Sequence, residues 1–148
     1  MIAQPDFKEL LALFNAHQVK YVIVGGYALA FHGAPRTTGD IDLFVEAKRD
    51  NAQRILEALK EFGFGNVGLS MEDFIKPDHV VQLGQPPVRV DIMTSISGVS
   101  WEDANESKQK GKYGNIPVYF LNRSLFLSNK RTSGRKKDQA DLEALGEQ

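Results

Sequence analysis

Apolar positions near the start of the chain recur first at helical spacing and then in a short unbroken run. Residues 5–17 place apolar side chains every three or four positions, which predicts an amphipathic helix covering a core. Residues 21–24, with the sequence YVIV, are rich in β-branched and aromatic side chains and predict a buried strand. Gly25 and Gly26 end that strand, and residues 27–32 have a helix-compatible composition. A strand, a glycine pair and a helix are therefore expected in direct succession.

The next segment alternates polar and apolar positions before helical spacing returns. Side chains of a strand alternate between its faces, so in residues 40–46 (DIDLFVE) Asp40 and Asp42 share one face and the residues between and after them point into the core. Residues 48–62 carry an apolar stripe at helical spacing, and Gly63 supplies a stop. This part of the chain predicts a strand with a polar face, followed by a scaffold helix.

Two further apolar segments, residues 79–83 and 88–96, predict an antiparallel hairpin. The four residues between them, Gly-Gln-Pro-Pro, form a turn-rich connection of the length that joins neighbouring strands. On the second strand Asp91 lies on the face opposite to Val90 and Ile92. An acid in the middle of a central strand is unfavourable without a partner. The alternative is that this face of the sheet is solvated.

The last third of the chain mixes polar helical segments with one more strand. Residues 101–110 are polar and predict a helix capped by Ser100. Residues 116–121 predict a last, edge strand, because Pro117 cannot donate to a β-ladder. From residue 122 onward the composition favours helices.

Length, charge and composition bound the function. A chain of 148 residues fits a single domain, with a core over about residues 20–121 and a C-terminal helical segment over 122–148. The formal net charge of -1 gives no global attraction to nucleic acids or acidic membranes, so any such attraction must be local. The sequence has no cysteine, which excludes disulfides and cysteine-ligated zinc. No apolar run approaches the roughly 20 residues of a membrane helix, and the N-terminus lacks a signal peptide, so a cytoplasmic protein is expected.

The glycine pair after the first strand has a chemical use as well as a structural one. Glycine lets the backbone approach a ligand closely, and the first turn of a helix offers unpaired N–H groups and the positive end of its dipole. Gly25 and Gly26 therefore suit a triphosphate. The simpler alternative is a tight turn, for which glycine supplies the dihedral angles.

Three acids form the strongest candidate for a metal site. Asp40 and Asp42 on one strand face repel each other, and at least one of their pKa values should rise unless a cation lies between them. Mg²⁺ prefers carboxylate and phosphate oxygens and keeps some of its waters, and Asp91 is the natural third acid for such a site. In the alternative, Asp40 caps a turn and Asp42 faces solvent on a half-exposed strand.

The end of the chain concentrates positive charge in a nearly neutral sequence. The basic residues there are Lys130, Arg131, Arg135, Lys136 and Lys137, the last four around Ser133-Gly134. Such a segment suits nucleotide phosphates or a nucleic-acid backbone. The alternative is a solvated basic loop.

Taken in order, these motifs resemble those of the nucleotidyltransferase superfamily of the DNA polymerase β type. The matching segments are Val24-Gly25-Gly26, Arg36-Thr37-Thr38-Gly39-Asp40-Ile41-Asp42-Leu43 and Val90-Asp91-Ile92. The sequence is most similar to a small bacterial branch that includes abortive-infection nucleotidyltransferase toxins. The closing pattern of that branch resembles Lys130, Arg135-Lys136-Lys137-Asp138 and Asp141-Leu142. The resemblance spans about residues 20–145; each motif alone is weak, but their order is specific.

The resemblance implies an α+β fold, in which a mixed β-sheet flanked by helices carries the metal site and C-terminal helices complete the domain. It implies transfer of a nucleoside monophosphate from an NTP to a hydroxyl of a protein, an RNA or a small molecule such as an aminoglycoside, with release of pyrophosphate. Two Mg²⁺ ions, or Mn²⁺ in their place, are the implied cofactors. One orients the triphosphate and the leaving group, and the other activates the acceptor hydroxyl.

By position, the resemblance assigns Asp40, Asp42 and Asp91 as catalytic metal ligands, with Asp91 as the candidate base toward the acceptor. The residues that it assigns to the nucleotide are Gly25, Gly26, Arg36, Thr37, Thr38, Lys130, Arg135 and Lys137. Gly26 stands where the superfamily most often has serine, so no hydroxyl is available there for a phosphate. The implied partners are the NTP, the acceptor, and an antitoxin or another protein that delivers the acceptor.

Three other roles fit the same residues. A member of a toxin–antitoxin system would use the same site in a particular biological setting. A non-catalytic module would bind a nucleotide or a partner without turnover, although the presence of all three acids argues against it. If the acids do not converge within metal-bridging reach, they are surface groups of an ordinary structural or interaction domain.

Overall fold

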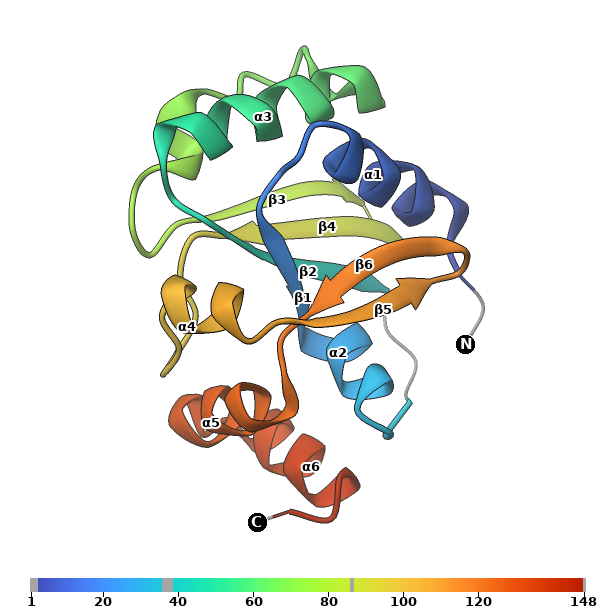
Figure 1. Cartoon of the computed structure of the whole chain (residues 1–148), viewed down its shortest axis with the longest axis vertical. Coiled ribbons are helices and arrows are strands. Elements are labelled where there is room, and N and C mark those ends of the chain that lie inside the picture. Colours follow the sequence, from blue (N-terminus) through green and yellow to red (C-terminus); the bar gives the residue numbers. More distant parts are fainter. Residues whose placement is uncertain (1–2, 36–38, 86, 148) are drawn as a thin grey trace.

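A six-stranded mixed β-sheet organises the computed structural model of the chain, which describes residues 3–35, 39–85 and 87–147 (Figure 1). The strands are β1 (Tyr21–Val24), β2 (Asp40–Val45), β3 (Val80–Gln85), β4 (Val88–Met93), β5 (Gln109–Tyr113) and β6 (Ile116–Phe120). The helices are α1 (Pro5–Ala16), α2 (Gly25–Phe31), α3 (Arg49–Leu59), α4 (Trp101–Glu106), α5 (Arg123–Ser133) and α6 (Lys136–Ala144). Short helical turns lie at Lys60–Phe64 and Met71–Phe74.

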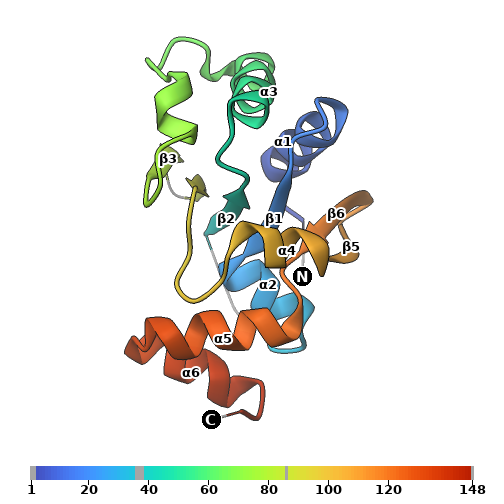
Figure 2. The same ribbon diagram turned by 60° about the vertical axis from the view of Figure 1, so that its left-hand side comes forward.

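The sheet has the order β3-β4-β2-β1-β6-β5. β2 is parallel to β4 and β1 is parallel to β6, whereas the other neighbouring strands are antiparallel. Helices α1 and α3 lie to one side of the strands, and α2, α5 and α6 lie to the other (Figures 1 and 2). The arrangement confirms the expected mixed sheet flanked by helices. Within the described parts of the chain, no helix is long and apolar enough to cross a membrane.

The hydrophobic pattern correctly predicted which faces are buried. The stripe of α1 is fully enclosed and consists of Phe7, Leu10, Leu11 and Phe14. In β2, Ile41 and Leu43 are fully buried, whereas Asp40 and Asp42 remain partly exposed. Each fully buried apolar side chain of this size contributes about 1.5–3 kcal/mol. A shift of β2 by one residue would exchange these groups for carboxylates, so the register that displays the acids is fixed by the core.

The strand β5 corrects the sequence prediction for residues 101–110. The helix expected there ends at Glu106, and Gln109–Tyr113 pairs with β6 instead. β5 is the exposed edge of the sheet, and only Tyr113 is buried along it. A strand of this kind lacks the apolar alternation from which a strand can be predicted.

The prediction that residues 116–121 form an edge strand is also wrong, because β6 lies between β1 and β5. Pro117 is tolerated near the start of β6, since the ladder between β6 and β1 is formed at Phe120. The carbonyl of Pro117 accepts a hydrogen bond of 2.7 Å from Asn15 Nδ2. The start of the strand is therefore tied to α1.

Candidate active site

The three acids predicted as metal ligands are brought together on neighbouring strands. Asp40 and Asp42 lie on β2, and Asp91 lies on β4, which runs parallel to it. The register pairs Asp42 directly with Asp91, and it pairs Asp40 with Arg89. Because alternate residues of a strand share a face, all four charged side chains belong to one face of the sheet. The three carboxylates therefore lie on one face of the sheet, and their assignment as joint metal ligands stays a prediction.

Burial and repulsion perturb Asp42. Burial, followed by the neighbouring carboxylates of Asp91 and Asp40, raises the pKa of Asp42 to about 7, and Lys137 opposes this rise. Asp91 is only 7% exposed, and its Oδ1 atom is buried without a hydrogen-bond partner among the described residues. Carboxylates that share a site in this way keep a proton or require a cation.

Arg89 supplies positive charge within the acid cluster. Its Nη2 atom lies 2.7 Å from Asp40 Oδ2 and 3.2 Å from Asp91 Oδ2. Its Nε atom is buried and has no hydrogen-bond partner in the part of the chain that the structure describes. In that same part, no three His, Asp or Glu side chains are arranged to hold a metal ion jointly. In this arrangement the guanidinium lies between two of the acids.

Gly25 brings the start of α2 directly against Asp42. Its φ of +68° lies in the left-handed region, which glycine adopts without the steric cost that other residues meet. A Cβ atom at Gly25 would overlap Asp42 Oδ2. Gly26 is buried in the first turn of the same helix. Glycine at position 25 is thus required both by the backbone angle and by the closeness of the carboxylate.

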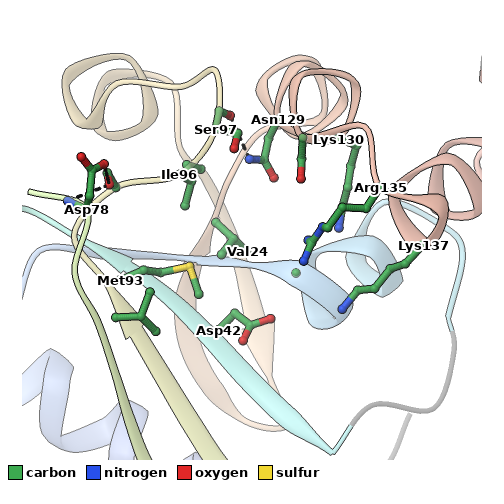
Figure 3. Close-up of a pocket in the computed structure, with 14 residues that line it drawn as sticks. Val24, Asp42, Asp78, Met93, Ile96, Ser97, Asn129, Lys130, Arg135 and Lys137 are labelled. Atoms are coloured by element: carbon green, nitrogen blue, oxygen red, sulfur yellow. Dashed lines mark hydrogen bonds between the residues drawn. The ribbon is translucent and has the colours of Figure 1, made fainter.

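Of the acid cluster, Asp42 lines a cleft of about 520 Å³ between the sheet and the C-terminal helices (Figure 3). This volume lies within the range of about 300–1,000 Å³ that is usual for small-molecule sites. Asp42 and Gly25 line one wall, and Arg135 and Lys137 face them from the other. The cleft therefore places two cations opposite the Asp42 carboxylate.

Lys130 also lines the cleft, but its charge is already engaged. It is 3% exposed, and its Nζ atom lies 3.2 Å from Asp138 Oδ1 and 3.0 Å from Asp141 Oδ2. These pairs join α5 to α6 across the turn at Gly134, whose φ is +65°. Lys130 is therefore a buried ionic connection between the two C-terminal helices.

Arg135 and Lys137 differ from Lys130 in their exposure. The Arg135 side chain is 64% exposed, and its Nε atom donates a hydrogen bond of 2.9 Å to Asp138 Oδ2. Although burial raises it, hydrogen bonds from Arg135, Ser133 and Lys130 hold the pKa of Asp138 well below its usual range. Lys137 makes no ion pair with any residue the structure describes, and its side chain points toward Asp42 (Figure 3).

Some predicted contacts lie outside the described residues. Arg36, Thr37 and Thr38 fall in the segment 36–38, so their assignment to the triphosphate stays a prediction. Sequence reasoning missed Arg89 as a member of the cluster. The signal for it was its position on the same strand face as Asp91, two residues earlier.

The far half of the cleft was also not foreseen from the sequence. It is lined by Asp78, Ser97 and Asn129, and Asn129 Nδ2 donates a hydrogen bond of 2.9 Å to the Ser97 carbonyl (Figure 3). These residues come from loops and from α5, and no local motif marks them. They add neutral and acidic polar groups at the end of the cleft away from Lys137.

The family whose model matches the chain gives its class: the protein is a nucleotidyltransferase. A family model described as the nucleotidyl transferase AbiEii toxin of type IV toxin–antitoxin systems matches residues 10–107, which is more than half of the chain. The chain belongs to this family. No curated protein sequence matches it.

Solved structures show the same fold. A candidate nucleotidyltransferase of Thermotoga maritima, TM1012, is 20% identical with a TM-score of 0.64, over 97% of this chain and 93% of its own. The lincosamide antibiotic adenylyltransferase LnuA, solved with lincomycin, is 16% identical with a TM-score of 0.57, over 98% and 97% of the two chains. An antigenic nucleotidyltransferase-like protein of Paracoccidioides brasiliensis is 18% identical with a TM-score of 0.56, over 97% and 75%.

Proposed function

We propose that this protein is a Mg²⁺-dependent nucleotidyltransferase that transfers a nucleoside monophosphate from an NTP to an acceptor hydroxyl and releases pyrophosphate. The observation that carries the proposal is that Asp40, Asp42 and Asp91 share one sheet face, and that Asp42 lines a cleft whose opposite wall presents Arg135 and Lys137. Triphosphates need cations on more than one side, and this cleft offers Arg135 and Lys137 together with the carboxylate oxygens of Asp42.

The chemistry of the three carboxylates, although not their present arrangement around Arg89, suits a divalent ion. The pKa of Asp42 is raised to about 7 by burial and by the neighbouring acids, and Asp91 Oδ1 has no hydrogen-bond partner among the described residues. A bound Mg²⁺ or Mn²⁺ would reduce the repulsion at Asp42 and would give Asp91 Oδ1 a partner, because carboxylate oxygens are its preferred ligands. Asp40, Asp42 and Asp91 would hold such ions. When bound, the ions would supply Lewis-acid stabilisation of the transferring phosphoryl group and lower the pKa of the acceptor hydroxyl.

The chain's own groups would bind and orient the nucleotide. Gly25 and Gly26 let the backbone at the start of α2 approach the phosphates closely. Lys137 and Arg135 would pair with the charge of the triphosphate from the opposite wall. Because Lys130 is paired with two carboxylates, we infer that it acts on the nucleotide indirectly, by holding α5 against α6.

Asp91 is the candidate acceptor for the proton that the attacking hydroxyl loses. It is the most buried of the three acids, and Arg89 pairs with its Oδ2 atom, which leaves Oδ1 free of protein hydrogen bonds in the described chain. A base must lie within hydrogen-bond reach of the proton that it takes. An acceptor hydroxyl bound beside Asp42 would meet this requirement, since Asp42 and Asp91 are directly paired in the sheet.

The acceptor and the biological setting are part of the same proposal. The family description names a toxin of type IV toxin–antitoxin systems, and we infer such a role, with an antitoxin, for this chain. The acceptor would be a hydroxyl of a protein, an RNA or a small molecule. LnuA has this fold and is a lincosamide antibiotic adenylyltransferase. The antibiotic is a property of LnuA and is not assigned to this chain.

The test is pyrophosphate release on incubation with each NTP, Mg²⁺ and candidate acceptors. We expect release that requires a divalent ion and is lost in the Asp40→Asn, Asp42→Asn double variant. The control variant Asp78→Asn replaces one carboxylate of the same cleft, outside the acid cluster, by its amide and should keep its activity. Equal activity of the double variant and the unmodified protein would contradict the assignment.

A further inference from the structure

A second cleft lies at the opposite end of β1 from the acid cluster. It has a volume of about 480 Å³ and is lined by residues at the end of α1, the start of β1 and the β5–β6 hairpin. It shares no lining residue with the cleft that contains Asp42. Because Lys20, Lys108, Lys110 and Tyr119 line it, we call it the lysine cleft.

The lysine cleft gathers positive charge that the protein itself does not neutralise. In the described residues, no carboxylate lies within ion-pair distance of Lys108 or Lys110. Lys20 approaches Glu46 at 3.9 Å, but Glu46 also approaches Lys48 at 3.8 Å. The contact between Lys20 and Glu46 is therefore long and shared. In a chain with a formal net charge of -1, this local excess is a feature of the cleft and not of the whole protein.

An aromatic ring lies within the same cleft. Lys108 Nζ sits 4.3 Å from the centre of the Tyr119 ring, and Lys110 is directly opposite Tyr119 in the β5–β6 ladder. Burial, and then the charge of Lys20, lower the pKa of Lys108. The ammonium groups of Lys108 and Lys20 thus repel each other beside the Tyr119 ring. A negatively charged ligand would relieve that repulsion.

We infer that the lysine cleft binds a phosphate-bearing ligand that is distinct from the donor NTP. Lysine ammonium groups bind phosphates as point charges, and an aromatic side chain among them offers a surface on which a base stacks. A single nucleic-acid strand and a free mononucleotide share this chemistry, and each could enter a cleft of this size. An acidic peptide would use the lysines but not the ring.

This inference deepens the proposed function by giving the enzyme a site for a nucleotide effector, or for a part of a nucleic-acid acceptor remote from its reacting hydroxyl. Only this interpretation of the binding rests on the proposed function. The binding itself is independent of the acid cluster. Binding at the lysine cleft can therefore be tested in a variant whose metal site has been removed.

The experiment measures fluorescence anisotropy of a labelled single-stranded oligonucleotide at several salt concentrations. The Lys108→Gln, Lys110→Gln variant should weaken binding at least tenfold at low salt. Neutralising phosphates contributes a slope of about -0.7 per contact for single strands in a plot of log affinity against log salt. The slope should therefore become shallower by about 1.4 in the double variant.

The matched control replaces two lysines outside the cleft, Lys60→Gln and Lys112→Gln, the second of which lies on the same strand β5. This control should change the affinity less than twofold. Tyr119→Leu should weaken the binding of the oligonucleotide more than that of inorganic phosphate. Competition by AMP at matched phosphate concentration would identify a mononucleotide as the ligand, and failure of AMP to compete would identify the strand.

The Asp40→Asn, Asp42→Asn variant separates this inference from the proposed function. It should bind the oligonucleotide as the unmodified protein does. Loss of oligonucleotide binding in that variant, an equal effect of the control pair, or no binding by the unmodified protein would each overturn the inference. None of these outcomes bears on whether NTP binds at Asp42.

Discussion

Gly25 and Asp42 are in such close contact that no side chain can be added at position 25 without moving the carboxylate. The two residues belong to successive elements, α2 and β2, and Asp42 is paired across the sheet with Val24, the residue before the glycine. The contact ties the start of α2 to the acid that is most strongly perturbed in the cleft. The glycine after β1 is therefore part of the site and not merely a turn.

Gly25→Ala should displace Asp42 and abolish divalent-dependent nucleotide binding. The cost of left-handed backbone for a residue with a Cβ atom, about 1–2 kcal/mol, should also lower the free energy of unfolding. Gly33→Ala is the matched control, because Gly33 has a φ of +114° but open space where a Cβ atom would lie. It should lose comparable stability and still bind nucleotide in calorimetric titrations. Nucleotide binding by Gly25→Ala at the unmodified affinity would contradict the role of this contact.

The stability of the protein without divalent ions should depend on pH through Asp42. Its pKa is raised from 3.8 to about 7 in the folded state, so the folded protein holds an extra proton between these values. The free energy of unfolding should therefore fall as the pH rises from about 4 to about 7, and it should level off above that. Urea unfolding in the presence of a chelator measures this slope.

Asp42→Asn should remove that part of the pH dependence, because the amide keeps the shape but does not titrate. Asp78→Asn should retain it, since Asp78 lies in the same cleft but makes its hydrogen bond of 2.7 Å with Ser95 Oγ. Identical slopes for Asp42→Asn and the unmodified protein would show that burial of Asp42 does not govern the pH response.

Arg89 should compete with divalent ions for the acids. Its guanidinium contacts Asp40 and Asp91, so Arg89→Gln should lower the thermal unfolding midpoint when a chelator is present. Mn²⁺ should then raise the midpoint more in the variant than in the unmodified protein, because the ion restores the missing positive charge. Arg54→Gln on α3 is a control for the loss of one arginine. Weaker stabilisation by Mn²⁺ in Arg89→Gln would mean that the arginine supports the metal site instead.

Variants of Lys130 and Lys137 should differ in what they change: the first should lower stability, and the second should weaken NTP binding. Lys130→Met leaves Asp138 and Asp141 buried without their shared partner, and breaking such a pair costs about 3–5 kcal/mol. Lys137→Met should change the free energy of unfolding little and weaken NTP binding several-fold, because Lys137 faces the cleft without an ion pair to the described residues. Chemical unfolding and calorimetry on both variants give the comparison. Weak NTP binding and normal stability in Lys130→Met would reverse the two roles.

The sequence predicted the parts of this molecule in which the local pattern and the tertiary structure agree. The alternation in β2 places Asp40 and Asp42 on one face, and the core residues between them fix that register. The polar strand β5 was not predictable, because an exposed edge has no apolar alternation to detect.

The partners of the charged residues could not be read from the sequence. The position of Arg89 opposite Asp40 depends on the pairing of two strands that are far apart in the chain. Likewise, Lys130 belongs to a basic segment that suggests a nucleotide contact, yet the fold buries it against two acids of α6. Charge patterns identify candidates, whereas the packing of the helices decides which charges remain available.

A metal-dependent nucleotide site at the acid cluster is best tested by calorimetric titration of each NTP into the protein, with and without Mg²⁺. The comparison uses the unmodified protein, the Asp40→Asn, Asp42→Asn variant and the Asp78→Asn control. We predict Mg²⁺-dependent binding of at least one NTP to the unmodified protein and the control, and none to the double variant. Binding that is equally strong in the double variant, or that does not require a divalent ion, would contradict a metal-dependent nucleotide site at these acids.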